Sequence, residues 1–218
     1  MNLFLISIMA LSLTPRQQAL SAIAACEAKG DQVALTACLN EGFDNGLTVS
    51  EAKEALSQLY AYTGFPRSLN ALGSLKAVLE DREAKGLNPD PGREADPLPA
   101  GYDALKQGTE IQTLLSGQPF DYSFAPQTDY YLKAHLFGDI FARNNLSHAD
   151  REIVTVSAIA CLPGCEPQLR AHVSGALNLG VKEDELRSIP SVMEATVGME
   201  AAERLRAAPA LVFCECRQ

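Results

Sequence analysis

The chain has 218 residues, of which 47% are hydrophobic and 21% are charged, and this length allows one large domain or two small ones. Its formal net charge of −9 repels phosphate backbones, which argues against nucleic acid as a partner. The six cysteines are too sparse for a small disulfide scaffold, and their spacing does not favour a zinc site.

Residues 1–13, MNLFLISIMALSL, form an apolar and uncharged stretch at the start of the sequence. The stretch is shorter than the ~20 residues that a membrane span needs, so we expect no membrane-spanning helix. It lacks a preceding Lys or Arg and a clean small-x-small cleavage site. These features favour a segment that packs on the body or on a neighbouring subunit of a cytoplasmic protein. The alternative is an export signal, which would make the protein exported or periplasmic.

Helix signals fill the first third of the chain. Thr14 and Pro15 combine a capping residue with a first-turn proline. The sequence TVSE at residues 48–51 is a capping box. Glycines and prolines give the remaining boundaries, and they predict helices over about residues 14–28, 31–46, 48–64 and 66–84.

The composition changes at residues 86–101, GLNPDPGREADPLPAG, which carry four prolines and three glycines and predict a linker or extended arm. One helix follows at YDALKQGTEIQTLLSG, then the irregular piece QPFDYSFAPQ. Two more helices are expected over about residues 129–142 and 147–161. Strand-like alternation is nearly absent, so the predicted fold class is all-α.

An internal repeat organises these helices. Gly30, Gly46, Glu51 and Gly64 recur 134 residues later as Gly164, Gly180, Glu185 and Gly198. This recurrence indicates duplication of one helical module, with two copies that pack about a pseudo-two-fold axis and share a core. The predicted divisions are an N-terminal segment, a first module, a linker or arm with one helix, a second module and a cysteine-containing tail. They cover residues 1–13, 14–84, 85–128, 129–208 and 209–218.

The second copy departs from the first at Pro190, which stands where the first copy has Leu56. A proline inside a helix removes a hydrogen bond and clashes with the preceding turn. We therefore expect the helix around Pro190 to be kinked or broken.

The stretch CLPGCEPQLRAH, residues 161–172, contains the main candidate for chemistry. Cys165, Gln168 and His172 are spaced to share one helix face, and Pro167 places Cys165 at the helix N-terminus, where a thiolate is favoured. Glu152 on the preceding helix reaches His172 or Cys165 if the two helices pack antiparallel, which would make a proton-relay site. The alternative is a buried cysteine with an ordinary structural histidine.

Other polar residues are weaker candidates. Cys161 is either a resolving thiol for Cys165 or a buried residue at a helix end, and Cys214 and Cys216 are resolving thiols or idle. Arg67 and Asn70 share a helix face and fit either a carboxylate substrate or a subunit contact. The residues that we assign to packing are His135, Tyr60, Tyr62, Phe65, Cys26 and Cys38, with His135 kept as a weak substrate-binding candidate together with Gln168.

Three motifs, LYAYTGFPRSLNAL, HLFGDIFARNNLSHADREIVTVSAIA and EPQLRAHVSGALNLGV, resemble the carboxymuconolactone decarboxylase family of the alkylhydroperoxidase D-like superfamily. The resemblance covers about residues 14–206 in two tandem modules. It implies an all-α fold and a homo-oligomer, commonly a trimer for two-module chains. In thiol peroxidases of this superfamily a Glu, a C-x-x-C pair and a His form the site. Glu152, Cys165 and His172 match these positions, but Gln168 replaces the second cysteine.

The resemblance implies two kinds of enzyme. The first prediction is a peroxiredoxin-like, thiol-dependent peroxidase, with Cys165 as nucleophile and His172 and Glu152 as the proton relay. The alternative is a decarboxylase that acts on a small lactone or keto acid through acid–base chemistry at His172 and Glu152. A third hypothesis is a non-catalytic accessory or binding member. None of these implies a metal or an organic cofactor, and the expected ligand is a peroxide or a small carboxylic acid.

Overall fold

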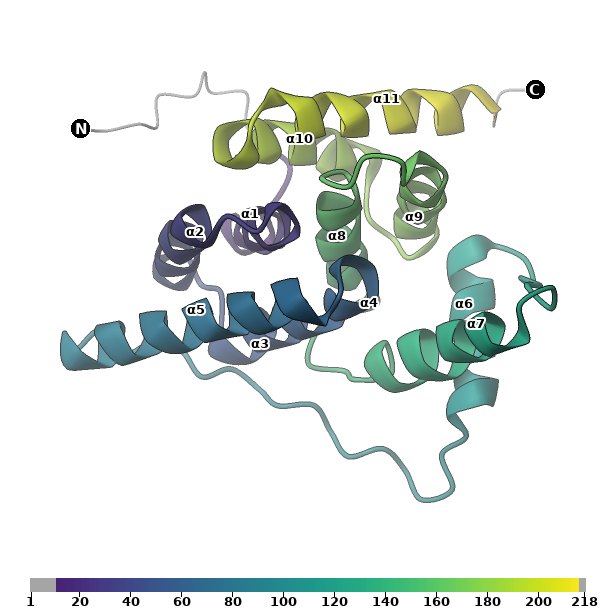
Figure 1. Ribbon diagram of the computed structural model, residues 1–218, viewed down its shortest axis with the longest axis horizontal. Helices are drawn as coiled ribbons and strands as arrows, with labels where there is room; N and C mark the ends of the chain where they lie inside the picture. Colours follow the sequence, from purple (N-terminus) through teal and green to yellow (C-terminus); the bar gives the residue numbers. More distant parts are fainter. Residues whose placement is uncertain (1–10, 216–218) are drawn as a thin grey trace.

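The computed structural model describes residues 11–215, with side chains up to residue 208, and all regular secondary structure in that range is helical (Figure 1). The predicted all-α class is therefore confirmed. Most of the apolar segment at residues 1–13, and the side chains of Cys214 and Cys216, lie outside this description. The helices are α1 (Pro15–Lys29), α2 (Gln32–Asp44), α3 (Val49–Gln58), α4 (Tyr60–Thr63), α5 (Phe65–Ala84), α6 (Ala104–Ser116), α7 (Pro126–Tyr130), η1 (Tyr131–Ile140), α8 (His148–Ile159), α9 (Glu166–Asn178), α10 (Glu183–Val197) and α11 (Met199–Glu215).

The helix ends follow the local signals in the sequence. Thr14 and Gln17 form a capping box at the start of α1, and Thr48 and Glu51 form one at the start of α3. Gly30 ends α1 in the left-handed conformation, with φ of 74°, which a residue with a side chain rarely adopts. The third predicted helix is divided, because α3 ends at Gln58 and the short α4 follows.

The core forms where the two modules meet. Helix α1 packs against α2, α8 and α10, and all of its residues from 19 to 28 are buried. This stretch is rich in alanine, whose small side chain lets neighbouring helices approach closely. The hydroxyls of Ser21 on α1 and Ser157 on α8 lie 2.8 Å apart in this interface. These serines occur in the SAIA sequences of the two modules, so the duplicated helices meet at matching positions.

The expected break at Pro190 in the second module is absent. Helix α10 continues unbroken through Pro190, because apolar side chains on both sides of the proline are anchored in the core, including Leu186, Ile189 and Met193. The backbone of the predicted tail at residues 209–218 belongs to α11 as far as Glu215. Helices α10 and α11 together cover one side of the bundle (Figure 1).

The proline-rich linker runs as an extended strap below α5 and α3 before it reaches α6 (Figure 1). It is held at the start of α3, where the backbone N–H groups of Val49 and Ser50 donate to the carbonyls of Asp90 and Pro91. Farther along, the side-chain amide of Asn144 donates to Asp96 at 2.7 Å. The strap therefore fastens the first module to the loop that precedes α8.

Helices α6, α7 and η1 form a separate layer at the side of the bundle (Figure 1). The predicted helix at residues 129–142 is a short α-helix followed by ten residues of π-helix. Helices α6 and η1 pack backbone to backbone at Gly108 and Gly138, where a Cβ atom on either glycine would overlap main-chain atoms of the other helix. This close approach explains why both positions are glycine.

Candidate functional site

Glu152 and His172 form a hydrogen-bonded pair between α8 and α9. Atom Nδ1 of His172 lies 2.9 Å from Oε2 of Glu152. The Glu152 side chain has no exposed surface, whereas His172 keeps 13% of its side-chain surface exposed. The two helices are consecutive and pack against each other, as the sequence predicted for this contact. The arrangement is a buried carboxylate that orients an imidazole with a path to solvent.

Tyr62 on α4 completes this cluster from the first module. Its ring meets the His172 ring edge to face, with centroids 5.5 Å apart. Burial raises the pKa of the Tyr62 hydroxyl, the nearby Glu152 charge adds to the rise, and hydrogen bonding with the Thr155 side chain opposes it. The hydroxyl therefore remains protonated at physiological pH and can act as a hydrogen-bond donor.

Two polar atoms of this cluster have no hydrogen-bond partner among the described residues. They are Oε1 of Glu152 and the hydroxyl oxygen of Tyr62, and both are buried. Buried polar atoms in native proteins are nearly always satisfied by protein or by a bound molecule. The cluster of Glu152, His172 and Tyr62 therefore has unused capacity to hold a small polar ligand or a water molecule.

Arg151, the residue before Glu152, does not neutralise that carboxylate. Its guanidinium is fully buried and donates to Oε1 of Glu54 at 2.8 Å, to Oε1 of Gln58 at 2.9 Å and to the carbonyl of Arg143 at 2.7 Å. Burial alone would raise the pKa of Glu54, but the charge of Arg151 brings it below the ordinary value. Arg151 therefore pairs with Glu54, and the hydrogen-bond partner of Glu152 is His172.

The thiols are not part of the Glu152–His172 contact. Cys165 precedes α9 and is half-buried, and its thiol is free and makes no hydrogen bond to either side chain. The seven residues between Cys165 and His172 correspond to about 10 Å along a helix. Cys161 is buried, donates to the carbonyl of Ser157 at 3.5 Å, and has a pKa raised to about 11 by burial. Its role as a resolving thiol stays a prediction.

The weaker candidates lie in other surroundings. Arg67 donates to the carbonyl of Ala28 at the end of α1. His135 on η1 pairs with Asp139 at 2.8 Å and also contacts the hydroxyl of Tyr60. Asn70 and Gln168 are exposed on α5 and α9. These residues have no hydrogen bond to the Glu152–His172 pair, so their role in substrate binding also stays a prediction.

Glu27 in α1 is a second buried carboxylate, and sequence reasoning overlooked it. Its Oε1 accepts a hydrogen bond from the Thr63 hydroxyl at 2.7 Å, while Oε2 is buried without a partner among the described residues. Burial raises its pKa to about 7. Thr63 follows Tyr62 in α4, so this short helix contacts both Glu27 and the His172 ring. The tyrosine-rich sequence before Gly64 was the one available signal for this role.

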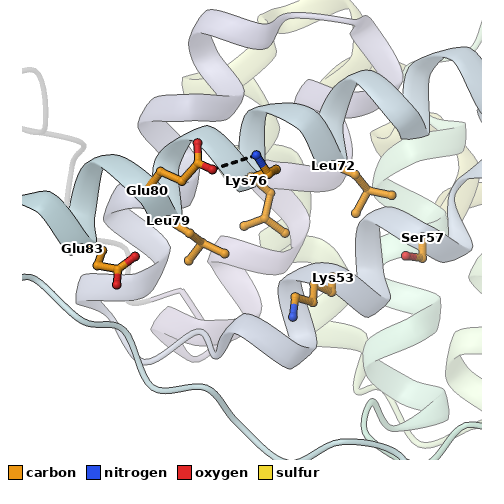
Figure 2. Close-up of a pocket in the computed structure, with 8 residues that line it drawn as sticks. Lys53, Ser57, Leu72, Lys76, Leu79, Glu80 and Glu83 are labelled. Carbon is orange, nitrogen blue, oxygen red and sulfur yellow. Dashed lines mark hydrogen bonds and ion pairs between the residues drawn. The ribbon is translucent and has the colours of Figure 1, made fainter.

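Two cavities lie away from this cluster. A groove of about 480 Å³ runs between α3 and α5, with leucines along its floor and charged groups such as Lys53, Lys76 and Glu80 at its edges (Figure 2). A second cavity of about 380 Å³ lies between the strap and the start of α8. Neither is lined by Glu152 or His172. Among residues 11–208, no group of three or more His, Cys, Asp or Glu side chains is arranged to hold a metal ion.

Comparison with known proteins agrees with this helical architecture. In two segments, residues 4–77 and 126–210, the chain matches the profile of the carboxymuconolactone decarboxylase family. It is 29% identical over 91 residues to 4-carboxymuconolactone decarboxylase of Acinetobacter baylyi, which covers 38% of this chain and 67% of that protein.

A second relative is a eukaryotic protein. The chain is 26% identical over 172 residues to Peroxisomal protein 2 of Saccharomyces cerevisiae, and the match covers 67% of this chain and 60% of the yeast protein. No helix within residues 11–215 is long and apolar enough to cross a membrane. Since the family profile matches well over half of the sequence, in the same two places as the internal repeat, the chain belongs to the carboxymuconolactone decarboxylase family.

Proposed function

We propose that the chain is an enzyme whose Glu152–His172 pair performs acid–base chemistry on a small lactone or carboxylic acid. The observation that carries this proposal is the 2.9 Å contact between Nδ1 of His172 and Oε2 of Glu152. A carboxylate at Nδ1 fixes the tautomer and orientation of an imidazole, which leaves Nε2 to exchange a proton with a bound molecule. The partial exposure of His172 supports access for such a molecule.

Tyr62 and Glu152 supply the polar groups for binding. The Tyr62 hydroxyl and Oε1 of Glu152 have no partner among the described side chains, so a ligand with one acceptor and one donor satisfies both. A protonated lactone acid, or a carboxylate with a neighbouring hydroxyl, has this combination. The proposed roles are therefore ligand orientation for Tyr62 and positioning of His172 for Glu152.

The name of the Acinetobacter baylyi relative suggests 4-carboxymuconolactone as the first probe. In its decarboxylation the bond between the carboxylate and the ring carbon breaks, carbon dioxide leaves, and the electron pair moves into the conjugated lactone. A proton must then be delivered to carbon. In this proposal His172 delivers the proton from Nε2 and regains a proton from water.

The experiment is to follow carbon dioxide release from 4-carboxymuconolactone by the wild type, Glu152→Gln, His172→Gln and Cys165→Ser. We expect the first two substitutions to lower turnover by ~10²-fold or more, since that is the usual contribution of a positioned acid–base group. Cys165→Ser and prior alkylation of the thiols should leave turnover intact. Turnover that survives both Glu152→Gln and His172→Gln would contradict the proposal.

A thiol peroxidase remains the second candidate. It is supported by the half-buried, free thiol of Cys165 at the start of α9. Gln168 stands in place of the usual second cysteine. Rapid consumption of hydrogen peroxide with sulfenic acid at Cys165, abolished in Cys165→Ser, would favour this function over acid–base chemistry. Absence of both activities from a correctly folded protein would favour a non-catalytic binding member.

We also propose that the protein is a homo-oligomer, such as a trimer, and that it is located in the cytoplasm. Each chain would contain two modules, at residues 14–84 and 129–208. Support for the oligomer comes from large apolar side chains left at the surface of α5, since Phe65 and Leu69 are 60% and 62% exposed. Light scattering after size-exclusion chromatography gives the mass directly. A monomer that persists at high concentration would overturn this proposal.

A further inference from the structure

Cys26 and Cys38 face each other across the helical hairpin of the first module. Their Sγ atoms are 3.8 Å apart, and both thiols are free. Cys26 lies in the last turn of α1 and has no exposed surface, whereas Cys38 lies midway along α2 and is partly exposed. Sequence reasoning assigned both to the apolar core, and it gave no sign that they meet.

The separation suits a disulfide. A disulfide bond is about 2.05 Å long, so the two sulfurs need to approach by less than about 2 Å. Movement on this scale lies within reach of side-chain rotation and small helix adjustments. The bond would join positions that are 12 residues apart and tie α2 to the buried helix α1.

The two thiols differ in the way that an attacking and a resolving cysteine differ. The thiol–thiol hydrogen bond, together with burial, raises the pKa of Cys26. The same hydrogen bond lowers the pKa of Cys38 against the effect of its burial. The thiolate is the nucleophilic form, and Cys38 is also the thiol that solvent reaches.

We propose that Cys26 and Cys38 are a redox-active dithiol that closes to a reversible disulfide by exchange with a small-molecule disulfide. The Cys38 thiolate attacks one sulfur of that molecule, its S–S bond breaks, and one thiolate leaves. Cys26 then gives up its proton and attacks Sγ of Cys38, which releases the second thiol. Two protein thiols are oxidised and one small disulfide is reduced to two thiols, so electrons and atoms balance.

The proposal adds a site to the first module that is independent of the Glu152–His172 pair. Under the 134-residue offset of the repeat, Cys38 corresponds to His172. The first module therefore has a thiol pair near the place where the second has a carboxylate–imidazole pair. Cys161 is the other thiol that influences the pKa of Cys26, so it is the cysteine that could compete with Cys38 for a disulfide.

The test uses the full chain and 2-hydroxyethyl disulfide as the oxidant. After oxidation the protein is denatured, alkylated, digested with trypsin and analysed by mass spectrometry. Cys26 and Cys38 fall on separate tryptic peptides, residues 17–29 and 30–53, while Cys161 and Cys165 share residues 152–170. We expect a linked pair of the first two peptides, with a mass two hydrogens below their sum, and its loss after dithiothreitol.

Single variants give the order of attack. Cys26→Ser should accumulate a mixed disulfide at Cys38, because the resolving thiol is missing, whereas Cys38→Ser should leave the buried Cys26 reduced. Cys161→Ser and Cys165→Ser are the matched controls and should still form the linked peptides. Full alkylation of both cysteines after oxidation of the folded wild type, or a Cys26–Cys161 link in its place, would overturn the proposal.

Discussion

Nδ1 of His172 lies 2.9 Å from Oε2 of Glu152, and this carboxylate is completely buried while the imidazole reaches solvent. Glu152→Gln keeps the size of the side chain and an oxygen for Nδ1, but it replaces the carboxylate that orients the imidazole with a neutral amide. We expect kcat/KM to fall by ~10²-fold or more with the fold retained. Glu27→Gln is the matched control, because it removes the other buried carboxylate beside α4 and should leave kcat/KM unchanged.

The Tyr62 hydroxyl is buried without a hydrogen-bond partner among the described side chains. Tyr62→Phe removes a buried hydroxyl that has no hydrogen bond of good geometry to the described side chains, although the Thr155 side chain is close enough to affect its pKa, so the free energy of unfolding should change by less than about 1 kcal/mol. Ligand binding should weaken, because the proposed donor is lost. Urea unfolding and substrate KM measure the two effects separately.

Tyr102→Phe provides the contrast for this variant, since the Tyr102 hydroxyl donates to the carbonyl of Gly138 at 2.5 Å. Here the free energy of unfolding should fall by about 1 kcal/mol, while ligand binding is unaffected. If Tyr62→Phe lost as much unfolding free energy as Tyr102→Phe, the Tyr62 hydroxyl would have to make a hydrogen bond of similar strength, which would contradict this interpretation.

Glu27 should make stability depend on pH. Burial raises its pKa to about 7, against an ordinary value of 4.5, so the folded protein keeps this proton to a higher pH than the unfolded chain does. The stabilising contribution is complete below about pH 4.5, declines as pH rises through this interval, and is lost above about pH 7. The measurement is urea unfolding of the wild type and Glu27→Gln at pH 5 and pH 8. The free energy of unfolding should fall between pH 5 and pH 8 in the wild type and fall less, or not at all, in Glu27→Gln. Parallel pH profiles would show that Glu27 titrates normally.

The Ser21–Ser157 contact should couple the two modules. Either single alanine substitution leaves the other serine hydroxyl in the buried interface without its partner. In Ser21→Ala the Ser157 hydroxyl keeps a second hydrogen bond, because it donates to the carbonyl of Ile153 at 2.7 Å. We expect Ser21→Ala to cost about 1 kcal/mol of unfolding free energy, and the double variant to cost less than the sum of the two single variants. A double-mutant cycle that is additive would mean that the hydroxyls do not interact.

Local chemistry made much of this fold predictable from the sequence. The capping residues Thr14, Asp31 and Thr48 stand at the starts of α1, α2 and α3, because their side chains satisfy backbone N–H groups at those ends. The break expected at Pro190 does not occur, because buried side chains such as Leu186 and Met193 hold the helix in the core on both sides of the proline. The π-helical geometry of η1 left no local pattern to detect.

The candidate site was predictable only in part. The sequence offered His172 or Cys165 as the partner of Glu152, and the structure has the contact with His172, because α8 and α9 are consecutive helices that pack against each other. Tyr62 and Glu27 were missed, since their positions depend on how α4 from one module sits between α1 and α8. The 3.8 Å contact of Cys26 with Cys38 likewise depends on the packing of α1 against α2, which spacing along the chain does not reveal.

The most direct test of the account is whether Glu152 and His172 move a proton to or from a carbon atom. The measurement is NMR detection of deuterium incorporated from heavy water into 4-carboxymuconolactone or its decarboxylation product by the wild type, Glu152→Gln and Cys165→Ser. We expect incorporation with the wild type and Cys165→Ser, and a loss of ~10²-fold or more with Glu152→Gln. Incorporation that persists in Glu152→Gln but disappears in Cys165→Ser would contradict it and transfer the chemistry to the thiol.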